Sequence, residues 1–200
     1  MLFFSDTFQY TGKSLAPSDE SDRILVQQAK KDPEAFGKLM ERYEVPLKRY
    51  LRRLTGWGDE EVMDILQESF IKAYRYLNNY DAGLKFSTWL YRITHNQAID
   101  MLRRAETRPF LKSVDIDEMA EFLPSSQDTE AQFLRQDDMN RVRLAILSLP
   151  LPYRDVLVLR YLEECSYEEI MDILKKPKGS IATLISRGRT LLMKRLVSLD

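Results

Sequence analysis

The sequence predicts an all-helical protein of two domains that are joined by an acidic flexible linker. Its 200 residues include only seven glycines and eight prolines, and long stretches contain neither, which favours helices over sheets. Apolar residues recur at steps of three and four over residues 22–104 and again over 137–200, as they do on amphipathic helices. Between these blocks the pattern is lost, so residues 105–136 are expected to be the linker and residues 1–21 a mobile tail.

The first block is expected to hold four helices. The first begins near Asp22, and the second opens at residues 32–34, where Asp can cap a helix and Pro suits its first turn. Pro46 lies inside the second helix and predicts a kink, because Pro removes a backbone hydrogen bond. We expect Asp59 to cap the third helix and Ser87 to cap the fourth.

The second block is expected to end in a helix-turn-helix. Ser166 and Glu169 have the spacing of a capping box, in which each side chain bonds the backbone of the other residue at a helix start. A tight turn over residues 175–179 ends this short helix. A basic helix then runs from Ser180 to about Val197.

The last helix presents one face that suits DNA. Ser180, Thr183 and Arg187 share this outer face, where short polar groups can reach base edges and a cation can hold phosphate or read guanine. Gly188 falls on the opposite face. Because Gly costs about 1 kcal/mol relative to Ala in a helix interior, we expect close helix packing there. The alternative is an ordinary helical hairpin with a solvated basic face.

Three aromatic residues, Phe86, Trp89 and Tyr91, stand at the start of a helix that also carries Arg92 and Asn96. Unpaired bases stack on aromatic side chains, with about 1–3 kcal/mol per base, while basic groups follow the nucleic-acid backbone. These residues therefore suit a protein that opens a duplex. The alternative is that Phe86 and Trp89 belong to a helix core, and we expect both to be at least partly buried whatever the function.

Charge divides the chain in the same way as the helical pattern. The net charge is −3 over residues 1–22, +4 over 23–104, −6 over 105–140 and +4 over 141–200. Two basic domains thus flank an acidic segment, a pattern that usually concerns partners rather than fold. The opposite charges of linker and domains also suit a closed state of the free protein, whereas the alternative is a solvated surface with a simple tether.

The residue counts and patterns exclude several functional classes. Cys165 is the only cysteine and His95 the only histidine, so neither a disulfide nor a Cys/His zinc site can form within one chain. No nucleophilic triad or phosphate-binding loop is recognisable, and we expect no catalytic residue, cofactor or metal. No apolar run reaches the roughly 18 residues of a membrane span, and the start does not look like a secretory signal. We therefore expect a cytoplasmic protein without membrane insertion.

Several segments, in order along the chain, resemble the extracytoplasmic-function sigma factors of the sigma-70 family. The resemblance covers residues 22–104 and 137–197. The segments that carry it are 35–43, 64–70, 86–93 with Asn96, 100–104, 149–154, 159–161, 166–170, 179–181 and 186–189. By this resemblance the chain is not an enzyme but a transcription-initiation factor, of a kind that often serves stress responses, with a sigma region 2 domain over 22–104 and a sigma region 4 domain over 137–200.

The resemblance also implies partners. Core RNA polymerase would be bound in two places, the clamp helices of its largest subunit and the flap of its second-largest subunit. Asp64, Gln67 and Glu68 lie at i, i+3 and i+4 on one helical face, and together with Phe70 they would bind the clamp helices. The acidic linker, with Asp115, Asp117 and Glu118, would thread channels that RNA later occupies. An anti-sigma factor is a further expected partner.

Promoter DNA is the other implied partner. The resemblance assigns the −10 element to Lys85, Phe86, Trp89, Arg92, Asn96 and Arg103, and the −35 element to Lys178, Ser180, Thr183, Arg187 and Arg189. The sequence departs from the family at Ala182 and Leu184, where a cation is often found, which puts −35 contacts at these two positions in doubt.

Two other functions stay open at the level of sequence. The first is a stand-alone transcription regulator, in which an upstream sensing domain controls a dimeric helix-turn-helix. The second is an enzyme that uses Asp64, Glu68 and Asp100 with a divalent metal, because carboxylates one helical turn apart can bind Mg²⁺.

Overall fold

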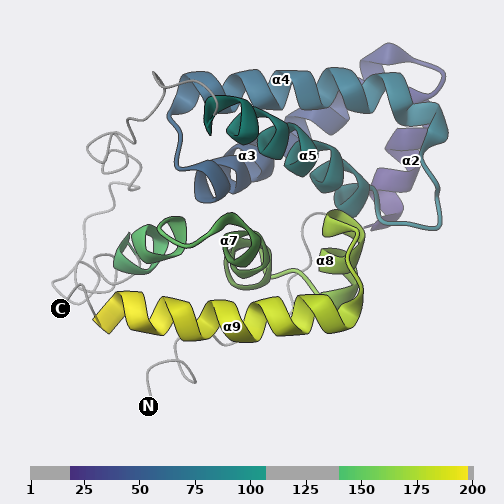
Figure 1. Ribbon diagram of the computed structural model, residues 1–200. Coiled ribbons are helices and arrows are strands. Elements are labelled where there is room, and N and C mark those ends of the chain that lie inside the picture. The colour runs from purple at the N-terminus through teal and green to yellow at the C-terminus, as the bar shows by residue number, and fades with distance from the viewer. Residues whose placement is uncertain (1–18, 107–139, 198–200) are drawn as a thin grey trace, which may run out of the picture.

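The computed structural model describes residues 19–106 and 140–197, and these residues form helices joined by short turns (Figure 1). The N-terminal domain consists of α2 (Asp19–Ala29), α3 (Pro33–Thr55), α4 (Asp59–Tyr76), the 3₁₀ turn η1 (Leu77–Asn79) and α5 (Phe86–Glu106). The C-terminal domain consists of a helix over 140–147, α7 (Leu151–Leu157), the π-helical turn η3 (Val158–Leu162), α8 (Tyr167–Leu174) and α9 (Lys178–Val197). The all-helical class is confirmed for these ranges, whereas the linker acids Asp115, Asp117 and Glu118 lie outside them.

Helix α3 begins and ends as its sequence predicts. The side chain of Asp32 accepts a hydrogen bond from the backbone N–H of Glu34 at 3.0 Å, and Pro33 occupies the first helical position. The helix ends at Gly56, whose φ of 72° is left-handed and therefore suits Gly. Pro46 lies inside α3, which runs from Pro33 to Thr55, and the expected kink there stays a prediction.

Three predicted helix starts differ from those observed. Gly58, not Asp59, is the N-cap of α4, and Asp59 is its first residue. The Asp59 carboxylate instead forms ion pairs with Lys48 and Arg52 of α3. Helix α5 begins one residue before Ser87, which is buried within its first turn. Helix α9 begins two residues before the expected start at 180.

The start of α8 and the packing of α9 agree with the sequence. The backbone N–H of Glu169 donates to the Ser166 hydroxyl at 3.1 Å, and the N–H of Ser166 donates to the Glu169 carboxylate at 2.8 Å. Helix α9 lies against α7, and a Cβ atom placed on Gly188 would lie only 3.3 Å from the Leu157 side chain. The expected close helix packing at Gly188 is therefore confirmed.

We predict that Gly188→Val lowers the free energy of unfolding by about 1–3 kcal/mol, the usual cost of overpacking a core. The added methyl groups meet Leu157, which is fully buried and has little room to move. Gly179→Val is the matched control, because Gly179 lies in the same helix with no atom within 4 Å of an added Cβ. Urea unfolding measures both, and equal or higher stability of Gly188→Val would contradict the packing.

The two domains pack against each other. Helix α5 lies beside α8, and α3 lies beside η3 (Figure 1). The buried apolar residues of both domains form one continuous cluster. Arg154 of α7 crosses the boundary and donates a hydrogen bond to the carbonyl oxygen of Leu54, at the end of α3, at 3.1 Å.

A buried carboxyl group, Asp155 of α7, lies near this boundary. It is 8% exposed, and burial raises its pKa from 3.8 to about 7, although Arg154 and Lys176 oppose the rise. Its charge in turn contributes to the raised pKa of Tyr50 in α3, which is mainly due to burial. One carboxylate oxygen of Asp155 has no hydrogen-bond partner. The folded protein therefore holds this carboxyl group largely protonated below pH 7.

We predict that Asp155→Asn changes the free energy of unfolding more favourably at pH 8 than at pH 4, with a difference of about 4 kcal/mol. The unfolded chain loses the Asp155 proton near pH 4 but the folded chain only near pH 7, so the stability of the wild type falls as pH rises through this window. Denaturant unfolding at both pH values measures the difference. Comparison with the wild type removes the contribution of Glu163, whose pKa is also raised by burial. Parallel pH profiles would contradict the prediction.

Candidate functional site

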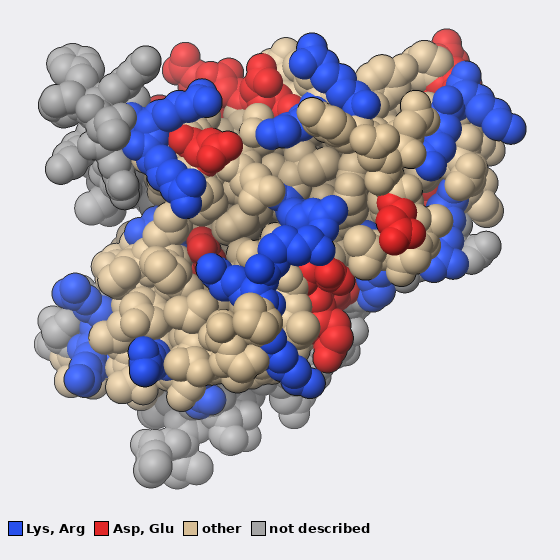
Figure 2. All heavy atoms as spheres, turned by 45° about the vertical axis from the view of Figure 1, so that its right-hand side comes forward, with Lys and Arg blue, Asp and Glu red and all other residues tan. Residues whose placement is uncertain are grey.

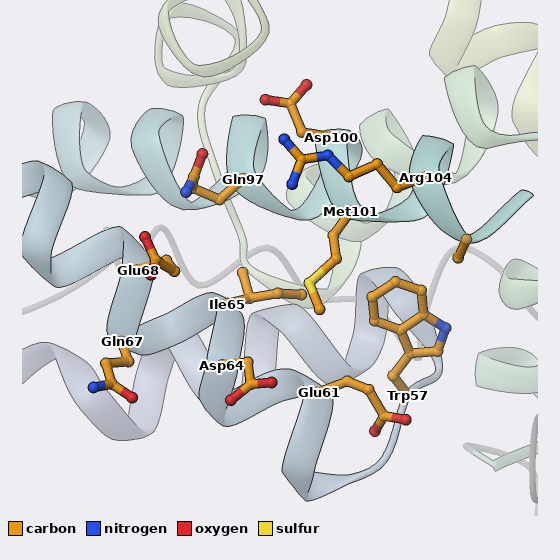
Figure 3. Close-up of a pocket in the computed structure, with 11 residues that line it drawn as sticks. Trp57, Glu61, Asp64, Ile65, Gln67, Glu68, Gln97, Asp100, Met101 and Arg104 are labelled. Atoms are coloured by element: carbon orange, nitrogen blue, oxygen red, sulfur yellow. The ribbon is translucent and has the colours of Figure 1, made fainter. Parts of the chain in front are cut away.

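A groove with a volume of about 730 Å³ lies between α4 and α5 (Figure 3). One wall is formed by α4, the other by the C-terminal half of α5, and Trp57 from the α3–α4 turn closes one end. The lining residues are Trp57, Glu61, Asp64, Ile65, Gln67, Glu68, Gln97, Asp100, Met101, Arg104 and Ala105.

The groove combines negative charge with an apolar floor. Four of its lining side chains are carboxylates and one is a guanidinium, so it is negative at neutral pH. Met101 extends from α5 towards Ile65 of α4, and the two apolar side chains lie between the charged ones (Figure 3). Such a surface can bind a cationic helical partner, because the charges attract it and the apolar floor supplies buried area.

The predicted polymerase-binding residues separate into two groups. Asp64, Gln67 and Glu68 are exposed and line the groove. Phe70 is only 5% exposed and belongs to the core of the N-terminal domain, so it supports α4 from within and offers no surface to a partner. Sequence reasoning missed the second wall, although Gln97 and Met101 do have the i, i+4 spacing of one helical face.

The aromatic residues at the start of α5 are core residues. Phe86 is 1% exposed and Trp89 is 6% exposed. Both rings pack against Tyr80, with centroids 5.5 Å and 5.3 Å apart, and Phe86 also packs edge-on against Tyr43 of α3 at 5.6 Å. The expectation that both would be at least partly buried is confirmed, and neither ring face is open to a base in this state.

The polar residues assigned to the −10 element are more exposed than the aromatic ones. Arg92 is half-buried, whereas Asn96 and Arg103 are exposed on α5. The Lys85 ammonium group forms an ion pair with Glu169 of α8 at 3.1 Å. Lys85 is thus paired with a residue of the C-terminal domain.

The outer face of α9 is exposed, as expected for a surface that binds DNA. All five −35 candidates of α9 are exposed: Lys178, Ser180, Thr183, Arg187 and Arg189. Lys178 lies 3.8 Å from Glu168 of α8, an ion pair on the surface. The Thr183 hydroxyl donates to the carbonyl oxygen of Gly179 at 2.8 Å.

The two departures from the family pattern have different surroundings. Leu184 is partly buried and packs against the core, which explains an apolar residue there. Ala182 is exposed, and nothing in the structure explains it.

Figure 2 shows Lys and Arg side chains gathered where the two domains meet, with Asp and Glu side chains beside them.

Asp64, Glu68 and Asp100, the carboxylates considered for a divalent metal, all line the groove. Within residues 19–106 and 140–197, no three His, Cys, Asp or Glu side chains are grouped as a metal site requires. In the same part of the chain, none of the helices combines the length and the apolar character that a bilayer crossing needs.

Comparisons with known proteins agree with each other. The Sigma-70 region 2 family matches residues 39–108, and the Sigma-70 region 4 family matches residues 139–192. The ECF RNA polymerase sigma factor SigW of Bacillus subtilis is 36% identical over 178 residues, which cover 86% of this chain and 94% of SigW. The structure of CnrH in complex with the cytosolic domain of CnrY matches with a TM-score of 0.64 and 26% identity, over 90% of this chain and 98% of CnrH.

A second solved structure supports the fold alone. It is the sigma factor RpoE in complex with the anti-sigma factor NepR from Bartonella quintana, which matches with a TM-score of 0.59. Its identity is 21%, and the match covers 82% of this chain and 98% of RpoE.

Proposed function

The chain belongs to the extracytoplasmic-function sigma factors of the sigma-70 family, and from this premise we propose which of its surfaces bind polymerase and promoter. As a sigma factor it directs core RNA polymerase to promoters and starts transcription there. Its relatives are not enzymes, and we propose the same of this chain, with no cofactor. We also propose that it works in the cytoplasm, where its polymerase is.

The α4–α5 groove is the proposed docking site for the clamp helices of the largest polymerase subunit. The observation that carries this proposal is the exposure of Asp64, Gln67 and Glu68 on one wall of a negative groove. Trp57 and Met101 add apolar area, which gives the groove the mixed character of a protein interface. The flap of the second-largest subunit is the proposed partner of the C-terminal domain.

The proposed DNA contacts lie on two helices. Lys85, just before α5, and Arg92, Asn96 and Arg103 on α5 face the −10 element, while Phe86 and Trp89 shape the helix from within the core. On α9, the exposed residues Lys178, Ser180, Thr183, Arg187 and Arg189 contact the −35 element, where hydroxyls reach base edges and cations hold phosphate or guanine. The acidic residues of the linker are proposed to lie in the polymerase channels that RNA later occupies.

An anti-sigma factor is a further proposed partner. The matched Bartonella quintana sigma factor was solved with an anti-sigma factor bound. Affinity purification of the chain from its native cell, before and after stress, tests this proposal. A small partner that is lost under stress would support it, and polymerase as the sole partner under every condition would count against it.

Transcription from a promoter library tests the proposed function. Sigma-free core polymerase, supplied with the purified chain, is expected to start transcription at fixed positions on a subset of fragments that share two elements. Core polymerase alone is the control. The stand-alone regulator that the sequence left open predicts a different outcome. Specific duplex binding by a dimer of the chain, without polymerase and without transcripts, would favour that candidate.

A further inference from the structure

A network of polar side chains joins three helices inside the N-terminal domain. Asp22 of α2 is only 1% exposed. One of its carboxylate oxygens accepts a hydrogen bond from the Arg42 guanidinium of α3 at 2.5 Å, and the other accepts one from the Tyr43 hydroxyl. The Ser87 hydroxyl, in the first turn of α5, donates to the Tyr43 oxygen. We call these four residues the Asp22 network.

The network ends at the aromatic residues around the start of α5. Tyr43 is fully buried, and its ring packs edge-on against Phe86 with the centroids 5.6 Å apart. Phe86 in turn packs against Trp89 at 5.6 Å, and both rings lie against Tyr80. Tyr43 therefore contacts the first turn of α5 twice, through its hydroxyl at Ser87 and through its ring at Phe86.

The chemistry of the network suits positioning better than stability. A buried ion pair gains little net free energy, because the loss of hydration offsets the attraction. An apolar residue such as Val26, which is buried one turn further along α2, needs no such partners. Hydrogen bonds are directional, however, and a fully bonded buried network fixes one arrangement of its members. Burial and then the hydrogen bond to Asp22 raise the pKa of Tyr43, so its hydroxyl remains a donor at neutral pH.

The first turn of α5 lies where the residues assigned to the −10 element begin. Lys85 immediately precedes this turn, and Arg92 and Asn96 follow on the same helix. A binding site of this kind requires supporting residues that hold it within about 0.5 Å of its productive geometry. No residue of the Asp22 network lines the α4–α5 groove. A fault in the network should therefore disturb −10 recognition and leave polymerase docking intact.

We propose that Asp22 is a positioning residue for −10 recognition, which holds Tyr43 and thereby the first turn of α5 in the orientation that reads promoter DNA. This inference rests on the proposed function. Arg42 supplies the opposite charge that a buried carboxylate needs, and it also donates to the Ser21 hydroxyl of α2 at 2.8 Å. Recognition of the −10 element then depends on α2, a helix that carries none of the residues assigned to that element.

Two substitutions in the network test the positioning role. Asp22→Asn removes the charge at nearly constant volume, and Tyr43→Phe removes only the hydroxyl and leaves the ring against Phe86. Run-off transcription with core polymerase is measured on a promoter from the library and on templates in which one base pair of the −10 or the −35 element is replaced. The factor by which activity falls on each replaced template is the discrimination at that element. A smaller fraction of folded protein lowers activity on all templates alike and leaves this factor unchanged.

The expected result is a loss of discrimination at one element only. The wild type should lose roughly tenfold or more of its activity for one wrong base pair at either element, whereas in both variants the −10 factor should fall below about threefold. Discrimination at the −35 element should stay at the wild-type value, because that element is assigned to α9. Fluorescence titration should show unchanged affinity for core polymerase.

Val26→Ala is the matched control. It removes buried apolar contact from α2 and leaves the side chains of the network in place. It should lower the free energy of unfolding and keep the wild-type discrimination at both elements. The double variant Asp22→Asn/Tyr43→Phe should discriminate no worse than either single variant, because both substitutions break the same contact.

Three results would count against these expectations in different ways. If Asp22→Asn discriminates at −10 as the wild type does, the network only holds the fold and the positioning role is overturned. Should circular dichroism show that Asp22→Asn is unfolded, Tyr43→Phe decides by the same criterion. If Val26→Ala loses −10 discrimination as strongly, any loosening of α2 is sufficient and Asp22 has no special role. A wild type that binds no polymerase, or that has no preference at −10, would instead refute the proposed function.

Discussion

Asp64→Lys/Glu68→Lys is expected to abolish holoenzyme formation and to lower promoter-specific transcription by about a hundredfold or more. The two carboxylates lie one helical turn apart on one wall of the α4–α5 groove. Reversing both charges places cations against a basic partner, and like charges across an interface cost several kcal/mol. A loss of about 2.7 kcal/mol of binding free energy already lowers the affinity a hundredfold. Fluorescence titration with core polymerase measures affinity, and run-off assays measure transcription.

A variant with the same charge change controls for global electrostatics. Glu41 and Glu44 are exposed on α3 and do not line the groove. Glu41→Lys/Glu44→Lys is therefore expected to keep polymerase affinity within about threefold. If both double variants lose binding equally, net charge governs association and the groove does not. If neither loses it, polymerase docks elsewhere on the chain.

Arg187→Ala is expected to lower transcription from promoters that depend on the −35 element by about ten- to a hundredfold. Arg187 is exposed in the row of α9 that we assign to this element. A bidentate contact between Arg and guanine contributes about 1–3 kcal/mol of discrimination, which corresponds to this range. Run-off transcription should also show weaker preference at one base pair of the −35 element, because the contact that distinguishes it is gone.

Template variants separate this role from a general loss of charge. On a template in which the guanine that Arg187 reads is replaced, the wild type should lose transcription activity. The Arg187→Ala protein should be equally active on this template and on the original one, because it no longer reads that guanine. Arg23→Ala changes an exposed Arg of α2 and is expected to leave both activities unchanged. An Arg187→Ala protein that retains the full wild-type preference at every base pair of the −35 element would exclude base reading by Arg187.

Short-range patterns in the sequence were sufficient to predict most of the helices and two of their N-terminal caps. The capping box of Ser166 and Glu169, the cap at Asp32 and the packing at Gly188 each depend on a few neighbouring residues, and the structure has all three. Asp59 was wrongly expected to cap α4 because its side chain pairs with Lys48 and Arg52 of another helix. The sequence pattern around Asp59 contains no sign of that competition.

The site depends on contacts between distant parts of the chain, which a pattern does not reveal. Helical spacing places Phe86 and Trp89 together whether they bind bases or fill a core, and the structure places them in the core. Glu163 and Glu164 are neighbouring glutamates in the sequence, yet Glu163 is buried against Arg53, 110 positions away. Only the packing of the two domains distinguishes these glutamates.

Photocrosslinking from the groove tests the central claim, that the α4–α5 groove binds the largest subunit of polymerase during promoter-specific initiation. A photoreactive amino acid replaces Gln67, which is exposed on the groove wall, and the complexes are irradiated while they initiate transcription. Exposed Met193 of α9 serves as the control position. We predict that position 67 crosslinks to the largest polymerase subunit and position 193 does not. Active complexes in which position 67 crosslinks to no polymerase subunit, or only to DNA, would contradict the claim.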